Sequence, residues 1–345
     1  MPSSLISTED GREVVDVWAC GLQSALHNID QTIKKGYTHI AIDTEFPGTL
    51  YKQRYEDRSA VVIYEIMRSN VDKLKPIQIG LSLTDANGQR PAGTSTWQFN
   101  MRFDVKSDRY EPKSLQMLED AKIPLNALTE RGIDHEDFKE AFKRSLMYNN
   151  SELRWLSFHG CYDFAYLFKA VTGDKMPSSL QGFNNLRKGI CPILYDVKML
   201  IQSNQSIMGY SLSKLAQVFE IPESGTFHQA GTDARVTAEL YFRVKDYLLG
   251  NKIKKFENKL FGLSKVFSIN SAEFDSRAKK KSLIERLNGV RTSRRRTQEL
   301  ESRINNKSAP MGYGVVYVSS YGNGYHNPNG KLATLTIGNE RRTRN

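Results

Sequence analysis

The segment Ile40-Ala41-Ile42-Asp43-Thr44-Glu45-Phe46-Pro47-Gly48 joins a short apolar run to two closely spaced acids. The apolar, β-branched start predicts a buried strand, and Pro47-Gly48 ends that strand. Residues i and i+2 of an extended chain point to the same face, so Asp43 and Glu45 project side by side. Mg²⁺ and Mn²⁺ prefer oxygen ligands of this kind. An isolated Asp-x-Glu is more often a pair of solvated acids in a turn. The choice between such a turn and a metal site therefore depends on the rest of the chain.

The sequence around this segment predicts an α/β fold. An amphipathic helix is expected over residues 12–35. The strand that carries Asp43 and Glu45 is followed by strands at 77–83 and 94–100, which suggests a meander. Further helices are predicted at 114–120, 135–148, 163–171, 212–219 and 233–249, and further strands at 153–158 and 194–197. A meander followed by alternating helices and strands indicates a mixed sheet flanked by helices.

Positive charge is concentrated at the C-terminal end of the 345-residue chain. The net charge is +11, but residues 263–345 hold sixteen Lys and Arg against six Asp and Glu, which leaves about +1 for residues 1–262. Basic clusters at 279–281 and 294–296 and a Gly/Tyr/Asn-rich stretch at 312–330 predict a largely disordered tail. We therefore expect an N-terminal extension (1–11), a folded domain (12–263) and a basic low-complexity tail (264–345).

The composition also predicts the compartment. Cys20, Cys161 and Cys191 show neither a C-x-x-C pair nor metal-ligand spacing, so free thiols in a reducing compartment are expected. The acids Glu9 and Asp10 argue against a signal peptide, and no apolar run approaches the length of a membrane span. We expect a soluble intracellular protein without a membrane partner.

Three further residues give the two acids a role. Asp163 lies at a predicted strand-to-helix turn, and Asp233 lies where a long helix begins; singly, each only complements a helix dipole. His228 precedes Asp233 by five positions, which do not share a helix face, so it is placed in the lead-in loop. Four carboxylates can hold two divalent cations for in-line displacement at phosphorus. A nearby histidine can take the proton of the attacking water. The whole set favours chemistry over chance.

The ordered set of Asp43, Glu45, Asp163, His228 and Asp233 resembles the DEDDh pattern of 3′–5′ exonucleases with a ribonuclease H-like fold. Within that group, Asp43-Thr44-Glu45-Phe46-Pro47-Gly48 resembles the Caf-type (Pop-type) deadenylase subunit of the CCR–NOT complex. The similarity covers about residues 12–263 and continues through the motifs Asn70-Val71-Asp72, Gln78-Ile79-Gly80-Leu81, Gly93–Asn100, Trp155–His159, Tyr162–Leu167, Tyr195–Lys198 and His228–Asp233.

This resemblance implies a metal-dependent 3′–5′ exoribonuclease that shortens the poly(A) tails of mRNA and releases 5′-AMP. It implies two divalent ions, Mg²⁺ or Mn²⁺, with His228 as general base and with metal ligands at Asp43, Glu45, Asp163 and Asp233. The implied partners are poly(A) RNA, the large Not scaffold subunit and the leucine-rich-repeat deadenylase of the same complex. The stretch Met208-Gly209-Tyr210-Ser211-Leu212 departs from the family's usual Gly-Gly pair, which concerns local substrate contacts and leaves the metal ligands alone.

Several neighbouring residues have alternative interpretations. Phe46 is a candidate to stack on the terminal base, and a core position is an equal alternative. His159 is interpreted as a hydrogen-bonded structural histidine, and Asp196 as a structural acid that could support a ligand. Trp97 and Trp155 are expected in the core.

Two other functions stay open. A DEDDh exonuclease acting on DNA or small structured RNAs would use the same site, since two-metal hydrolysis does not need a 2′-OH. A non-catalytic scaffold subunit of the complex is expected to lose a ligand, and this chain keeps all five site residues. The basic tail allows non-specific RNA binding, nuclear import or a solvated extension.

Overall fold

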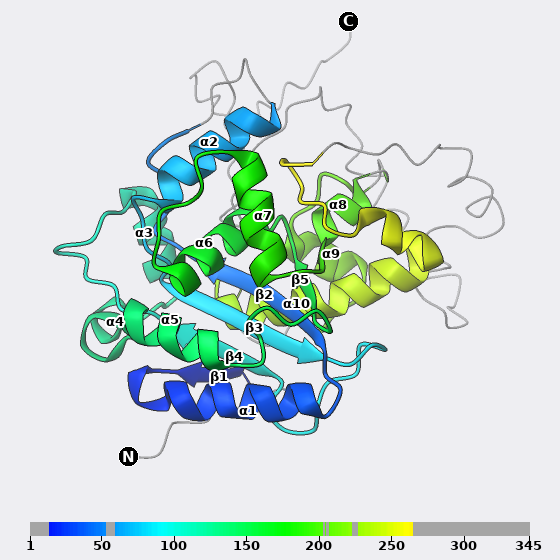
Figure 1. Cartoon of the computed structure of the whole chain (residues 1–345), viewed down its shortest axis with the longest axis horizontal. Helices are drawn as coiled ribbons and strands as arrows, with labels where there is room; N and C mark the ends of the chain where they lie inside the picture. Colours follow the sequence, from blue (N-terminus) through cyan, green and yellow to red (C-terminus); the bar gives the residue numbers. More distant parts are fainter. Residues whose placement is uncertain (1–13, 53–58, 203, 205–206, 223–226, 265–345) are drawn as a thin grey trace, which may run out of the picture.

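A six-stranded mixed sheet crosses the centre of the computed structural model, which describes residues 14–52, 59–202, 204, 207–222 and 227–264 (Figure 1). The strands are β1 (Val14–Val17), β2 (His39–Glu45), β3 (Gln78–Thr84), β4 (Thr96–Asn100), β5 (Arg154–Ser157) and β6 (Leu194–Asp196), in the order β1-β4-β3-β2-β5-β6. Strands β2, β3 and β4 form the predicted antiparallel meander. The pairs β1–β4, β2–β5 and β5–β6 are parallel. The predicted α/β mixed sheet is thereby confirmed.

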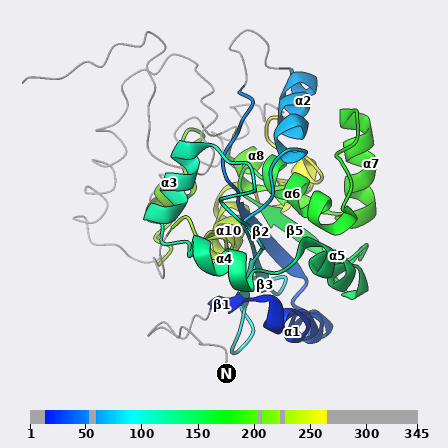
Figure 2. The ribbon, with the colours of Figure 1, turned by 90° about the vertical axis from the view of Figure 1, so that its left-hand side faces the viewer.

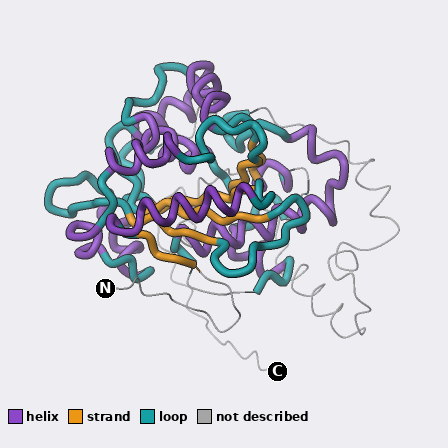
Figure 3. Tube along the Cα trace, turned by 60° about the horizontal axis from the view of Figure 1, so that its bottom comes forward, coloured by secondary structure: helices purple, strands orange, loops and turns teal. Residues whose placement is uncertain are grey.

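Helices enclose this sheet, as Figures 2 and 3 show from two further directions. They are α1 (Leu22–Lys34), α2 (Ala60–Val71), α3 (Pro112–Asp120), α4 (Leu125–Arg131), α5 (His135–Arg144), α6 (Cys161–Thr172), α7 (Leu180–Ile190), α8 (Val197–Ile201), α9 (Leu212–Val218) and α10 (Ala230–Val244). Short 3-10 helices span Ala19–Gly21 and Gly250–Phe256, and a π-helical turn spans Lys245–Leu249. None of the described helices is long and apolar enough to cross a membrane.

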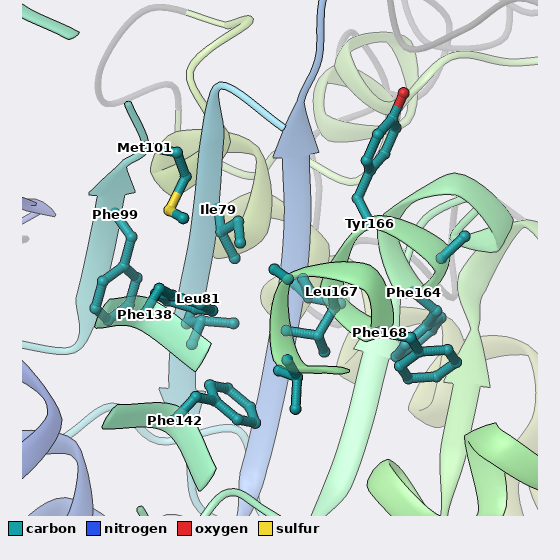
Figure 4. Packing of buried hydrophobic residues seen from close by; sticks show 14 of the residues in the cluster. Ile79, Leu81, Phe99, Met101, Phe138, Phe142, Phe164, Tyr166, Leu167 and Phe168 are labelled. Carbon is teal, nitrogen blue, oxygen red and sulfur yellow. The ribbon is translucent and has the colours of Figure 1, made fainter. Parts of the chain in front are cut away.

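Buried side chains form two clusters, one on each face of the sheet. Ile40 and Ile42 of β2 pack in the first cluster with side chains from α1, α2, α5 and α6. Figure 4 shows part of this cluster, where Leu81 of β3 lies on the same side of the sheet as the α5 and α6 side chains. Ala41 packs in the second cluster, with side chains from α8, α9 and α10. Because side chains alternate along a strand, Asp43 and Glu45 lie on the face that α10 covers.

The predicted helix over residues 12–35 is wrong in its first part. Residues 14–17 form strand β1, which pairs in parallel with β4, and the α-helix begins only at Leu22. The three valines there are β-branched and favour an extended backbone. The apolar residues at 14–17 fit the spacing of a helix as well as that of a strand. Whether they form a helix or a strand therefore depends on the partner strand β4.

Other elements differ at their ends or were not predicted. The helix predicted over 135–148 ends at Arg144, and the one predicted over 233–249 runs as α-helix from Ala230 to Val244. Helices α2, α4, α7 and α8 were not predicted; Ser59 caps α2 by accepting a hydrogen bond from the Val62 N–H. Predictions about residues 1–13 and 265–345, including the disordered tail, lie outside the described residues. The domain boundaries therefore stay predictions.

Several residue-level predictions are confirmed. Trp97 and Trp155 are buried in the core. Cys20, Cys161 and Cys191 are free thiols, the first exposed and the other two buried.

Candidate active site

The site lies at the edge where three parallel strands end. Strands β2, β5 and β6 run in the same direction, so their carboxyl ends meet at one edge of the sheet. Asp43 and Glu45 stand at the end of β2, and Asp163 lies in the first turn of α6, directly after β5. All three carboxylates are almost completely buried. The edge therefore gathers acids that are far apart in the sequence.

Asp163 is fixed to β2 by hydrogen bonds. Its Oδ1 accepts one from the backbone N–H of Thr44 at 2.9 Å and another from the Thr44 hydroxyl at 2.6 Å. Thr44 lies between Asp43 and Glu45, on the opposite face of the strand from their side chains. The threonine thus ties the start of α6 to the strand that carries the other two acids.

Asp233 reaches the same edge because α10 begins very close to the sheet. Gly80 of β3 is the partner of Asp43 in the antiparallel register. A Cβ atom at Gly80 would lie 2.0 Å from the carbonyl oxygen of Ala230, so a side chain there would push the first turn of α10 away. Asp233 sits in that first turn and is 3% exposed.

The buried acids repel one another. Burial, together with repulsion from Asp163, Asp233 and Glu45, raises the pKa of Asp43 well above its usual range. Burial raises the pKa of Asp163 to about 7 in spite of the Thr44 hydrogen bonds, and it raises the pKa of Asp233 to about 7 as well. A divalent cation between these groups would relieve both the repulsion and the desolvation.

Two buried oxygen atoms in the site support such a cation. Asp43 Oδ2 and Asp233 Oδ1 have no hydrogen-bond partner among the described residues. Buried acceptors of this kind normally find a partner, and a metal ion can serve as one. The donor set is rich in carboxylate oxygens, which suits Mg²⁺ and Mn²⁺. The residues present therefore fit the divalent ions that the sequence predicts.

His228 lies in the loop that leads into α10, as predicted. Its backbone has φ +68°, in the left-handed region, and its N–H donates to Asp233 Oδ2 at 3.2 Å. One ring nitrogen of His228, one carboxylate oxygen of Glu45 and one carboxylate oxygen of Asp233 all lie within 4.8 Å of one another. Burial lowers the pKa of His228, so the neutral ring can accept a proton or hold a metal ion.

His159 and Asp196 are joined by a hydrogen bond from the His159 backbone N–H, where β5 and β6 end. Asp196 accepts hydrogen bonds from the backbone N–H groups of His159, Gly160, Lys198 and Phe261. The His159 ring stands edge-on to Phe261, with centroids 4.9 Å apart. Burial and the charge of Lys198 lower the pKa of His159 to about 4. Asp196 therefore organises the backbone that follows β5.

Phe46 is only 4% exposed. Its ring stacks on Tyr162 at 5.3 Å between centroids and lies 4.7 Å from the ring of Tyr166. These contacts are those of the core alternative, and stacking on a base stays a prediction.

Asn70 is a neighbour of the site whose role the sequence did not show. Its Oδ1 accepts hydrogen bonds from the N–H groups of Leu50 and Tyr51, and its Nδ2 donates to Tyr51 O and Tyr162 Oη. Asn70 thereby joins the segment after Gly48 to the residue before Asp163. The motif Asn70-Val71-Asp72 marked the position, but only the fold shows these partners.

Comparisons with known proteins agree with this architecture. A model described as the CAF1 family ribonuclease matches residues 17–154. The poly(A) ribonuclease pop2 of Schizosaccharomyces pombe is 36% identical over 258 residues, which cover 74% of this chain and 76% of that protein.

Two solved structures are similar over most of the described chain. The S. pombe Pop2p structure with Mg²⁺ and Mn²⁺ bound has a TM-score of 0.68 and 34% identity, and the match covers 72% of this chain and 99% of that one. A chain in the structure of the yeast NOT1 MIF4G domain co-crystallised with CAF1 has a TM-score of 0.64 and 29% identity, covering 75% of this chain and 100% of that one.

The six-stranded mixed sheet with acids gathered at one edge defines an α/β protein with a ribonuclease fold. With a relative 36% identical over most of both proteins, the chain belongs to the CAF1 ribonuclease family.

Proposed function

We propose that this protein is a metal-dependent 3′–5′ exoribonuclease that shortens the poly(A) tails of mRNA and releases 5′-AMP. The observation that carries the proposal is the convergence of Asp43, Glu45, Asp163, Asp233 and His228 at one edge of the sheet. The poly(A) substrate rests on the name of the S. pombe relative and on the sequence resemblance.

Four carboxylates would hold two divalent ions in this proposal: Asp43, Glu45, Asp163 and Asp233. When bound, the ions supply a water of lowered pKa and neutralise charge at the reacting phosphate. Asp43 Oδ2 and Asp233 Oδ1 are the acceptors available to such a partner. The S. pombe Pop2p structure that carries Mg²⁺ and Mn²⁺ supports the choice of metal. Thr44 keeps Asp163 oriented through two hydrogen bonds.

His228 is the proposed general base. Its ring nitrogen lies near carboxylate oxygens of Glu45 and Asp233, so it is close to any water held between them. Burial and the charge of Lys198 lower the pKa of His159 to about 4, which makes it a poor proton acceptor at neutral pH. His228 therefore takes the proton of the attacking water, and the leaving 3′-oxygen receives a proton from solvent.

The proposal extends to substrate contacts, partners and location. Phe46 remains a candidate to stack on the terminal base. The yeast CAF1 that was co-crystallised with a NOT1 MIF4G domain supports a Not scaffold as partner. The leucine-rich-repeat deadenylase, and a location in the cytoplasm and the nucleus, rest on the sequence resemblance.

The test is degradation of 5′-labelled oligonucleotides by the purified protein, with Mn²⁺ or with EDTA. We expect stepwise shortening of oligo(A) from the 3′ end, dependence on the metal, and slower turnover of oligo(C), oligo(U) and oligo(dA). Equal turnover of oligo(dA) would favour the broader DEDDh exonuclease. An inert protein that still binds a Not scaffold fragment would favour the non-catalytic subunit.

A further inference from the structure

The helix that carries Asp233 begins without a cap of its own. The first N–H groups of a helix need acceptors, usually from a Ser, Thr, Asp or Asn side chain at the N-cap. The N-cap of α10 is Gln229, whose side chain makes no capping hydrogen bond. Instead, Gln78 Oε1 accepts from the Ala230 N–H at 3.3 Å, and Gln98 Oε1 accepts from the Gly231 N–H at 2.9 Å. The sheet therefore caps α10.

These glutamines stand in the same rows of the sheet as the acids of the site. Asp16, Gln98, Gly80 and Asp43 are successive partners across β1, β4, β3 and β2. Asn100, Gln78 and Glu45 form the next row towards the edge. Paired residues present their side chains on the same face, here the one that α10 covers.

The negative charge of Asp16 orients the amide groups. Asp16 Oδ1 accepts hydrogen bonds from Gln98 Nε2 and Asn100 Nδ2, each at 2.9 Å. A carboxylate can only accept, so it turns the NH₂ group of Gln98 towards β1 and the carbonyl towards α10. Gln78 is oriented in the same way, because its Nε2 donates to Asn100 Oδ1 at 2.9 Å.

The network leaves little room for another arrangement. Gln78, Gln98 and Asn100 are at most 5% exposed, so a reversed amide would bury mismatched groups. Gln229 Oε1 accepts from Gln98 Nε2 at 3.1 Å, and Gln229 Nε2 donates to Ala121 O at 2.7 Å. A buried network in which amides have matching partners specifies one geometry.

We propose that Asp16, Gln78 and Gln98 are positioning residues for the metal-binding end of α10. The proposal rests on the proposed function of Asp233 as a metal ligand. The Asp233 N–H donates to Gln229 O at 3.0 Å, and Asp233 Oδ2 accepts from the His228 N–H. If the two glutamines no longer hold the first turn of α10, both Asp233 and His228 are therefore displaced.

The experiment compares the full-length variants Asp16→Leu and Gln98→Leu with wild type, because leucine has the branched shape of aspartate and offers no acceptor to Gln98 Nε2 and Asn100 Nδ2. An exposed pair supplies matched controls, because Gln116 Nε2 donates to Asp120 Oδ1 at 3.2 Å on the surface of α3. Asp120→Leu and Gln116→Leu repeat the same changes away from the site. Mn²⁺ affinity is measured by calorimetry without RNA, and amide hydrogen exchange is followed at residues 228–235.

We expect Mn²⁺ affinity to fall about tenfold in Asp16→Leu and Gln98→Leu, with faster exchange at Ala230 and Gly231. The controls should match wild type. Saturating Mn²⁺ should restore kcat with KM for oligo(A) unchanged, which a general loss of folding would not do.

Wild-type Mn²⁺ affinity and exchange in both variants would overturn the proposal and leave the proposed function intact. Equal losses in the Gln116 and Asp120 controls would also overturn it. A wild-type protein that binds no Mn²⁺ would instead refute the metal site. Should Gln98→Leu not fold, the Asp16→Leu variant decides, since Asp16 is only half-buried and leucine has nearly the same shape as aspartate.

Discussion

The carboxyl groups of the site work against the folded state as long as no cation lies between them. Asp43 is the clearest case, because burial and three neighbouring acids all raise its pKa. Replacing one acid removes repulsion together with a ligand atom. Stability and activity should therefore respond in opposite directions.

Asp43→Asn should abolish turnover of oligo(A) while raising the thermal midpoint in EDTA. A gain of about 1 kcal/mol corresponds to roughly 2–4 °C for a domain of this size. Differential scanning calorimetry in EDTA at pH 8 and a nuclease assay with Mn²⁺ measure the two effects. Near wild-type turnover in saturating Mn²⁺ would remove Asp43 from the ligand set. The same test applies to Glu45, Asp163 and Asp233.

His228→Ala should lower kcat by about 10²–10⁴-fold, the usual contribution of a general base. Activity should recover partly at higher pH, where hydroxide replaces the base. His159→Ala is the comparison, because His159 packs against Phe261 and should affect stability more than kcat. A pH–rate profile of both variants shows which histidine acts as the general base. An active His228→Ala variant together with an inactive but folded His159→Ala variant would assign that role to His159.

At the scale of elements, the residue at which a strand or a helix begins depends on partners that are distant in the sequence. Residues 14–17 fit a helical pattern, and they form a strand because β4 offers an edge to pair with. Helix α10 was predicted to begin at Asp233 and begins at Ala230, because Gln78 and Gln98 supply its caps. The local sequence shows neither the partner strand of residues 14–17 nor the distant glutamines that cap α10.

Gly80→Ala should displace the start of α10. The added Cβ would meet the backbone of Ala230 at 2.0–2.1 Å, and backbone cannot move aside as a flexible side chain can. We expect a loss of about 1–3 kcal/mol in the free energy of unfolding and a marked loss of Mn²⁺ affinity. Gly189→Ala in α7 is the control, since nothing lies within 4 Å of its Cβ position. Equal stability and affinity in the two variants would contradict the close approach.

His39 makes the contact between β2 and α10 sensitive to acid. Burial, helped by the charges of Lys245 and Arg154, lowers the pKa of His39 to about 4. The unfolded chain binds a proton on His39 more tightly than the folded protein does. The contribution of His39 to the free energy of unfolding is therefore complete above about pH 6.5 and is lost as pH falls towards 4. The ring lies 5.4 Å from that of Phe242.

His39→Phe should therefore flatten the pH dependence of stability by about 1–2 kcal/mol between pH 7 and pH 4.5. Urea unfolding of wild type and variant at both pH values measures this difference. The exposed His27 of α1 provides the control variant His27→Phe. Parallel stability curves for wild type and His39→Phe would show that His39 does not titrate in this way.

At the scale of the whole molecule, the sheet explains why the site could be predicted from motifs. Asp43 lies near the end of strand β2, and Asp163 and Asp233 lie in the first turns of α6 and α10. Parallel strands bring such positions to one edge of the sheet. Sequence order was therefore enough to name the cluster. Gly80, Asn70 and the glutamines act through the packing of α10 and α2 on that edge, which no local pattern encodes.

The distribution of charge over the whole chain leads to the last prediction. Residues 1–262 carry about +1 and have little long-range attraction for RNA, whereas residues 263–345 carry about +10. Ending the chain after residue 264 should leave kcat on short oligo(A) unchanged, because the candidate site lies before that point. Affinity for long RNA should fall, and the slope of log affinity against log salt should become shallower by ~0.7 for each phosphate group that the protein no longer neutralises.

Binding of long RNA to the shortened chain, measured by fluorescence anisotropy over a range of salt concentrations, checks this expectation. A full-length variant with Gln at 279–281 and 294–296 separates charge from chain length. It loses six of the sixteen Lys and Arg side chains, so its RNA affinity and salt slope should lie between those of wild type and of the shortened chain. If both proteins bind as tightly as wild type with the same salt slope, the basic segment does not recruit RNA, since counterion release requires that Lys and Arg side chains neutralise phosphates. Its two clusters would then be tested as a nuclear-import signal, by following where a tagged fusion of residues 264–345 accumulates in cells.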